Sequence, residues 1–200
     1  MHPKHRRSLT ALVRRGVMTA ESSVQASHRW LPGVRALENL FGRLDLGGVM
    51  GFLDRIFRRP PPPDDSWKLA KAEDDGRSLI FRIRTAPPAF ARKDQFPFLL
   101  AVCWKYESPN EHGMPSKDDA DRMGELEDLL LPVFEGKQKA FLTVVVTGNG
   151  VREWQWYAAD KDAVMKLANQ TLGERDPFPI EFVFQDDPDW DAYGRFLGDG

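Results

Sequence analysis

The stretch KAFLTVVVTGNGVREWQWYA, residues 139–158, decides the fold that this sequence predicts. Its first half, 139–147, is rich in β-branched residues, which favour strands. The Gly-Asn-Gly triplet at 148–150 can adopt the positive φ angles that a tight turn between antiparallel strands needs. Residues 151–158 then return as a second strand, so the sequence predicts a β-hairpin here.

One strand and one helix are predicted on each side of this hairpin. The complete order is strand 98–106, helix 116–131, strand 139–147, strand 151–158, helix 160–172 and strand 179–185. Right-handed crossovers pack such a β-α-β-β-α-β run into four antiparallel strands with two helices on one face. We therefore expect an α+β fold, a ferredoxin-like sandwich with strands 98–106 and 151–158 at its centre.

Capping residues set the expected helix ends. Ser116 and Asp160 precede the two helices and can accept hydrogen bonds from their first free backbone N–H groups. Pro132 is expected to end or kink the first helix, because proline lacks an N–H and its ring clashes within a helix. Gly173 is expected to close the second helix.

Two further elements flank this run. Residues 67–72 and 78–85 alternate as a half-buried hairpin, with Arg82 and Arg84 on the side opposite to its apolar residues. We expect this hairpin to extend one edge of the sheet or to cover part of its open face. After the last strand, Pro188 suits the first position of a short C-terminal helix.

The first 65 residues divide into three parts. Residues 1–48 lack sustained periodicity and are expected to be a disordered basic extension. Residues 49–59 place apolar side chains at helical spacing and predict a short amphipathic helix, either lying against the domain or anchoring it to a membrane surface or a partner. The Pro-rich run 60–65 predicts a stiff linker to the domain at 66–200. A second hypothesis places the native start of translation at Met50 and not at Met1.

The charge is distributed unevenly along the chain. Residues 1–59 hold eleven Lys and Arg against four acidic residues, whereas residues 60–200 hold 17 against 26. A domain with this negative balance is a poor nucleic-acid binder, and a basic partner suits it better. The chain has one cysteine and no apolar run of about 20 residues, so we expect a cytoplasmic location.

Several ordered motifs resemble a known bacterial family. They include Leu126-Glu127-Asp128, the stretch 146–154, Trp156-Tyr157, Pro179-Ile180-Glu181 and the stretch 186–193. In this order and spacing, over roughly 66–198, the chain resembles the bacterial family catalogued as domain of unknown function 695. That family resembles, more distantly, the RraB-like regulators, which bind and inhibit ribonuclease E. The resemblance implies a ferredoxin-like fold and a non-catalytic, protein-binding role.

The sequence offers little for catalysis. Cys103 and His112 form a conceivable but weak alternative site, since Cys103 falls in the middle of a predicted strand, where buried inert thiols are usual. The paired carboxylates are explained by helix capping and solvated faces. We therefore expect no enzyme activity, no cofactor and no metal site.

Aromatic residues raise two questions about binding. Trp104, Trp154 and Trp156 are predicted on the central strands, where they either pack in the core or stack nucleic-acid bases, and the acidity of the domain favours the core. The C-terminal segment holds the candidate partner-binding residues Asp186, Asp187, Asp189, Trp190 and Tyr193. For Trp190 and Tyr193 the competing interpretation is an anchor that holds the last helix on the core.

The leading functional hypothesis is a regulatory module whose acidic surface binds a basic patch on a protein, with RNA-processing machinery as the suggested context. One alternative is a small-molecule-binding or hydrolytic domain in which the loop 107–115 covers the sheet. A second alternative is a membrane-surface adaptor that binds through residues 50–59.

Overall fold

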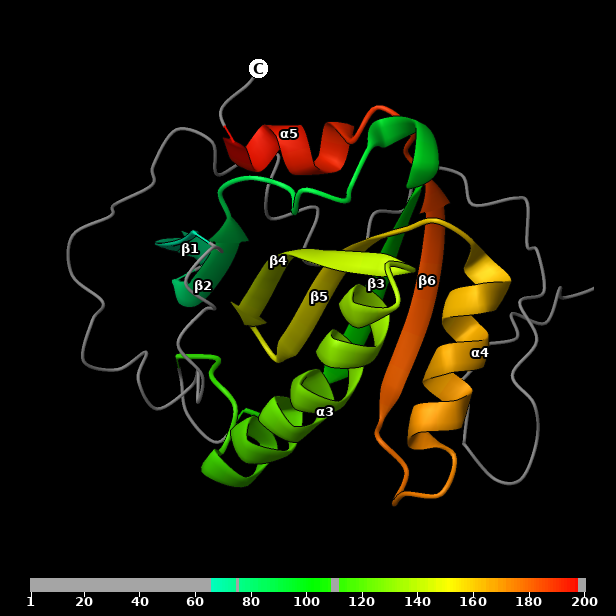
Figure 1. The fold of residues 1–200 in the computed structure, drawn as a ribbon. Coiled ribbons are helices and arrows are strands. Elements are labelled where there is room, and N and C mark those ends of the chain that lie inside the picture. Colours follow the sequence, from blue (N-terminus) through cyan, green and yellow to red (C-terminus); the bar gives the residue numbers. More distant parts are fainter. Residues whose placement is uncertain (1–65, 75, 109–111, 198–200) are drawn as a thin grey trace, which may run out of the picture.

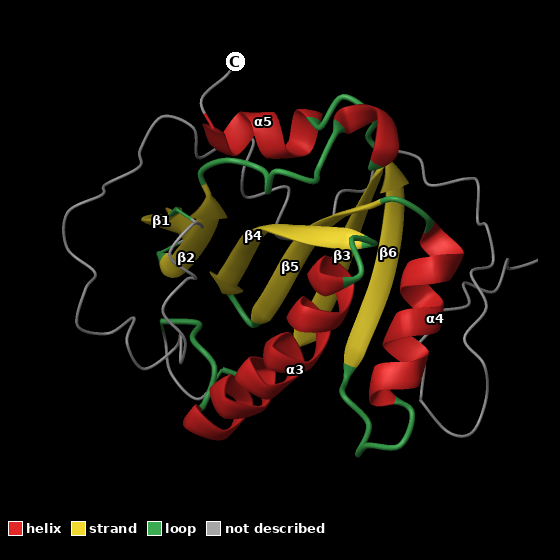
Figure 2. Ribbon diagram, viewed as in Figure 1, coloured by secondary structure: helices red, strands yellow, loops and turns green. Residues whose placement is uncertain are grey.

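The computed structural model describes residues 66–74, 76–108 and 112–197. In this part of the chain, a six-stranded antiparallel sheet carries three α-helices (Figures 1 and 2). The strands are β1 (Trp67–Asp74), β2 (Arg77–Arg84), β3 (Phe98–Lys105), β4 (Ala140–Gly148), β5 (Val151–Ala158) and β6 (Ile180–Asp186). The helices are α3 (Lys117–Gly136), α4 (Lys161–Leu172) and α5 (Asp191–Leu197), with a 3-10 turn η1 (Lys93–Gln95). The predicted α+β class is confirmed.

The strand order is β1-β2-β4-β5-β3-β6, and every neighbouring pair is antiparallel. The predicted central strands, β3 and β5, are paired with each other in the interior of the sheet. The leading hairpin extends the sheet at β4, with Phe81 of β2 opposite Val146. Of the two positions expected for this hairpin, the structure thus shows the one at the sheet edge.

Two apolar cores lie on opposite faces of the sheet. On the helix face, α3 and α4 pack on strand residues that include Leu100, Val102, Trp154 and Trp156. On the other face, here called the α5 face, α5 packs on Phe81, Phe141 and Tyr157 (Figure 1). Because side chains alternate along a strand, consecutive residues of β5 serve different cores.

The predicted N-caps are confirmed. The Ser116 hydroxyl accepts a hydrogen bond from the Asp119 backbone N–H at 3.1 Å, and an Asp160 carboxylate oxygen accepts one from Ala163 N–H at 2.6 Å. The end predicted at Pro132 is wrong, because α3 continues to Gly136. Phe134, beyond the proline, is fully buried in the helix-face core, and this packing holds the last turn in place despite the missing N–H.

The predicted end of the second helix is confirmed, whereas the predicted start of the last helix needs correction. Gly173 closes α4 with a right-handed φ of −64°, and a Cβ there would lie 2.6 Å from the Asn169 carbonyl oxygen. The last helix begins at Asp191, three residues after the expected Pro188. Trp190 has a φ of +59°, which is incompatible with a continuous right-handed helix through this point.

The turn between β4 and β5 has the expected backbone. Gly148, Asn149 and Gly150 all have positive φ angles, of 147°, 51° and 76°. A Cβ at Gly148 would lie 2.2 Å from the Ser78 carbonyl oxygen, so β2 approaches too closely for any side chain there. The predictions for 1–48, 49–59, 60–65 and Met50 concern residues outside the described part of the chain.

Candidate functional site

The segment from Asp186 to Tyr193 connects β6 to α5, and every third side chain from Asp187 onward is buried. Asp187, Trp190 and Tyr193 are buried, with 8%, 7% and 2% of their surface exposed. Asp186 and Asp189, the other two candidate binding residues, are exposed. The segment that the sequence singled out is therefore divided into an inner set and an outer set.

Asp187 organises the inner set. One carboxylate oxygen accepts hydrogen bonds from the Tyr157 hydroxyl and, at 3.0 Å, from the backbone N–H of Ala192. The other accepts one from Asp191 N–H at 2.9 Å. Burial, together with this carboxylate, raises the pKa of Tyr157, so the phenol keeps the proton that it donates. Asp187 thus caps α5 and ties it to strand β5.

The two aromatic residues complete this attachment. The indole N–H of Trp190 donates to the Phe96 carbonyl oxygen at 2.9 Å, and its ring packs edge-on against Phe141. The Tyr193 hydroxyl donates to the Arg84 carbonyl oxygen at 2.7 Å. Their burial favours the interpretation of these residues as anchors of the last helix. Contact with a partner stays a prediction for the outer residues.

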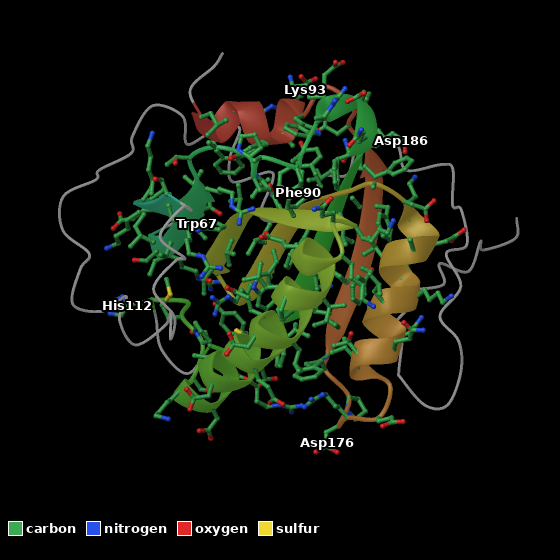
Figure 3. All side chains as sticks on the ribbon, in the orientation of Figure 1. Trp67, Phe90, Lys93, His112, Asp176 and Asp186 are labelled. Carbon is green, nitrogen blue, oxygen red and sulfur yellow. The ribbon has the colours of Figure 1, made fainter. Side chains whose placement is uncertain are left out.

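The outer carboxylates gather at one end of the sheet. Phe98 pairs with both Ala158 and Asp186, so the end of β5, the start of α4 and the end of β6 are neighbours. We call the exposed carboxylates there the aspartate end, and they are Asp160, Asp162, Asp186, Asp189 and Asp191. Figure 3 shows Asp186 beside the start of α4.

Basic residues also occur near the aspartate end. The Lys161 ammonium group lies 2.9 Å from an Asp186 carboxylate oxygen in an exposed ion pair. Arg92 and Lys93 are exposed on the neighbouring turn, where Arg92 pairs with Asp94. The carboxylates of the aspartate end outnumber these cations, so this end of the molecule keeps a negative balance.

A buried ion network lies on the helix face, between β2, β5 and α3. Glu127 accepts hydrogen bonds from Arg82 and from the Trp154 indole N–H, and its other ion partner is Arg152 at 4.0 Å. Burial disfavours the charge of Glu127, but the two arginines outweigh this and lower its pKa. Burial lowers the pKa of Arg152 to about 10, partly offset by Glu127.

Sequence reasoning missed this network. Arg82 and Arg84 occupy the polar side of an alternating strand, a pattern that predicts exposure to solvent. Instead α3 covers this side, and Arg84 is buried beside Glu135 at 2.9 Å. The guanidinium groups of Arg82 and Arg84 also lie over the Trp67 ring, with their central carbons 4.9 and 5.0 Å from the ring centroid. Strand alternation separates the two faces of a sheet but does not tell whether a face is covered.

The three tryptophans of the central strands belong to the core. Trp104, Trp154 and Trp156 are at most 2% exposed and pack under α3 and α4. Phe134 meets Trp156 edge-on, with the ring centroids 5.2 Å apart. The core interpretation is confirmed, and these rings are not accessible for stacking on nucleic-acid bases.

The surroundings of Cys103 and His112 do not favour the weak alternative site that these two residues were predicted to form. Burial, together with the nearby Glu153 and Glu181, raises the pKa of the Cys103 thiol, which keeps it in the less reactive protonated form. His112 is exposed in the loop before α3 and is labelled in Figure 3. The Gly113 carbonyl beside it accepts a hydrogen bond from Tyr106 at 2.9 Å and another from the Gly150 backbone at 3.2 Å. The described part of this loop therefore lies at the β4–β5 turn.

Two kinds of feature are absent from the described residues. No group of three or more His, Cys, Asp or Glu side chains in this part of the chain has the geometry to hold a metal ion. No helix among the same residues is long and apolar enough to cross a membrane.

Taken together, the fold and site define an antiparallel α+β domain with a buried C-terminal attachment and an acidic end. A family model described as "Family of unknown function (DUF695)" matches residues 65–198. The chain belongs to this family. No curated protein and no solved structure matches the chain.

Proposed function

We propose that this chain is a non-enzymatic interaction module whose aspartate end binds a basic segment or patch of a partner protein. The observation that carries this proposal is the combination of exposed Asp186, Asp189 and Asp191 with the rigid attachment beneath them. Buried Asp187 holds the backbone that presents all three. Preorganised carboxylates gain affinity because less conformational freedom is lost on binding.

The charge of the whole domain supports the same partner chemistry. Residues 60–200 carry 26 acidic against 17 basic residues, and three of those basic residues, Arg82, Arg84 and Arg152, are engaged with Glu127 and Glu135. Fewer cations are thus left to compete at the surface. Long-range attraction of this sign accelerates encounters with a basic partner and weakens with salt.

We also infer that the topology is ferredoxin-like and that the partner belongs to the RNA-processing machinery. The order β4-β5-β3-β6 is what a β-α-β-β-α-β run gives when it folds in that way. The second inference rests on the resemblance of the sequence motifs to RraB-like regulators of ribonuclease E.

Affinity capture from the native cell tests the proposal, with the full chain as bait. One variant, Asp186→Asn/Asp189→Asn/Asp191→Asn, removes three of the five carboxylates of the aspartate end. A control, Glu125→Gln/Glu174→Gln/Asp176→Asn, removes the same charge from exposed positions elsewhere. We expect the native chain and the control variant to recover a basic protein that the first variant does not recover. When binding to that protein is measured with purified components, the first variant should have at least about tenfold lower affinity than the native chain.

Two results would contradict this proposal. One is equal loss of the partner with both variants, which would indicate unspecific charge attraction. The other is binding that does not change between about 50 and about 150 mM salt, since contacts between exposed charges are screened over this range.

A further inference from the structure

A row of hydrogen-bond acceptors crosses one end of the α5 face. Strand pairing places Glu153 of β5 beside Cys103 of β3, and Cys103 beside Glu181 of β6. Gln155 follows on the same face, and its amide N–H donates to the Glu153 carboxylate at 2.8 Å. We call these four residues the acceptor row.

Among the described residues, no cation pairs with Glu153 in the acceptor row. Glu153 is contacted by the Gln155 amide and, at 3.8 Å, by the Cys103 sulfur. The side-chain oxygen of Gln155 is buried without a hydrogen-bond partner. Lys105 follows on the same face, but it is exposed. Burial raises the pKa of Glu153, and the hydrogen bonds from Gln155 and Cys103 only partly offset this.

The described helices do not explain why three residues of the acceptor row are buried. Glu153 is 1% exposed, Gln155 2% and Cys103 5%, whereas Glu181, on the edge strand β6, is exposed. Yet α3 and α4 pack on the opposite face, and α5 packs around Phe81, Phe141 and Tyr157. Cys103 and its neighbour Ala101 belong to neither of the two core clusters. This end of the face therefore needs a cover that brings apolar surface and a cation.

The sequence contains a segment with both properties. In the helix predicted for residues 49–59, Val49, Phe52, Leu53, Ile56 and Phe57 share one side. Arg55 and Arg59 are one turn apart and border this side, whereas Arg58 projects from the opposite one. We propose that the α5 face at the acceptor row is the docking site of residues 49–59, with Arg55 or Arg59 supplying a guanidinium group to Glu153.

The distances allow this docking within one chain. Strands β1 and β5 are three strand spacings apart, which is about 14 Å. The Pro-rich residues 60–65 span about 20 Å when extended. The opposite charges of the two parts also favour docking, because residues 1–59 are strongly basic and the domain is acidic. A tethered segment also docks at a high effective concentration.

Cys103 provides a direct readout, since it is the single thiol of the protein and lies in the acceptor row. The rate of its modification by N-ethylmaleimide is measured in the full-length chain by mass spectrometry. Phe52→Asp and Ile56→Asp are expected to raise this rate at least about tenfold, because they remove the apolar cover. The matched control Phe41→Asp, outside the docking segment, leaves the rate unchanged.

The arginines are tested in the same assay. In the native background, the double variant Arg55→Gln/Arg59→Gln is expected to raise the rate of Cys103 modification several-fold. In a chain that already carries Glu153→Gln, the same double variant is expected to have no effect, because the contact between arginine and Glu153 is already lost. The control Arg58→Gln, on the opposite side of the predicted helix, is expected to leave the rate unchanged in both backgrounds. Far-UV circular dichroism and the unfolding midpoint of each variant separate loss of the cover from loss of the fold.

Three outcomes would overturn the proposal. The first is a native thiol that reacts as fast as in denaturant, and the second is an unchanged rate in Phe52→Asp. The third is a rate that rises on dilution of the native protein, which would assign the cover to a second copy of the chain. None of these outcomes bears on the aspartate end, so the interaction proposal is tested separately.

Discussion

Aspartates of the segment 186–193 illustrate how position decides what one residue type does. Asp187 and Asp189 are two residues apart, but the first is buried under three hydrogen-bond donors and the second is exposed. Because Trp190 has a positive φ, the chain reverses after Asp189 and brings the N–H groups of α5 back to Asp187. One aspartate is therefore engaged inside the fold, and the other faces solvent.

Substituting these two aspartates should separate stability from binding. Asp187→Ala leaves two backbone N–H groups and the Tyr157 hydroxyl without their acceptor, so we expect a loss of about 2–3 kcal/mol in the free energy of unfolding. Asp189→Ala is expected to change it by less than about 0.5 kcal/mol. Urea denaturation followed by tryptophan fluorescence measures both. A similar cost for the two variants would refute the division into inner and outer residues.

At the scale of elements, α3 is held to the sheet by ion pairs as well as by apolar packing. Its inward side chains include Met123, Leu126, Leu130 and Phe134, while Glu127 and Glu135 reach the arginines of β2. Arg152 joins this network from β5, so the helix, the leading hairpin and a central strand are linked by one set of charges. The hairpin is thus attached through its side chains in addition to its backbone pairing.

Removing the Glu127 carboxylate should lower the free energy of unfolding, by an amount that depends on pH. Glu127→Gln leaves the buried Arg152 and the partly buried Arg82 beside a neutral group, and we expect a loss of about 3 kcal/mol in the free energy of unfolding at pH 7. The folded-state pKa of Glu127 is lowered, so its contribution is complete above the unfolded value of about 4.3 and is lost as the pH falls through the folded value.

The difference in unfolding free energy between the native chain and Glu127→Gln should therefore shrink on acidification below about pH 4. Denaturation curves at a series of pH values measure it. Glu125→Gln, two residues away and half exposed, is the control that should show neither the cost nor the pH dependence. A difference that stays constant down to pH 2 would show that folding does not lower the pKa of this carboxyl, and would contradict its stabilisation by the arginines.

For the whole molecule, the sheet order determines which parts open most readily. Strand β5 is paired on both sides, and all its residues after Val151 are buried. Strands β1 and β6 form the two edges and retain exposed side chains. Stability is consequently expected to decrease from the middle of the sheet toward its edges.

Amide hydrogen exchange provides the corresponding measurement. We expect the amides of β5 and β3 to exchange slowest and those of β1 to exchange at least about tenfold faster, because fewer contacts must break to expose an edge. Strand β6 serves as an internal comparison at the opposite edge. Equal protection of β1 and β5 would contradict this gradient and would indicate that another part of the protein covers the hairpin edge.

Local patterns in the sequence by themselves determined the elements of this protein, because strand alternation, helical spacing, caps and the Gly-Asn-Gly turn act between neighbouring residues. They correctly predicted the strands, the N-caps at Ser116 and Asp160, and the core position of the tryptophans. They erred at Pro132, where packing of the following residues outweighs the local preference.

Only the tertiary structure decided what lies on each face. The Glu127 network, the inward turn of Asp187 and the acceptor row join residues from strands and helices far apart in the chain. Their partners depend on strand register and on which layer covers which side of the sheet. No local spacing encodes these features, since they arise when separate segments pack together.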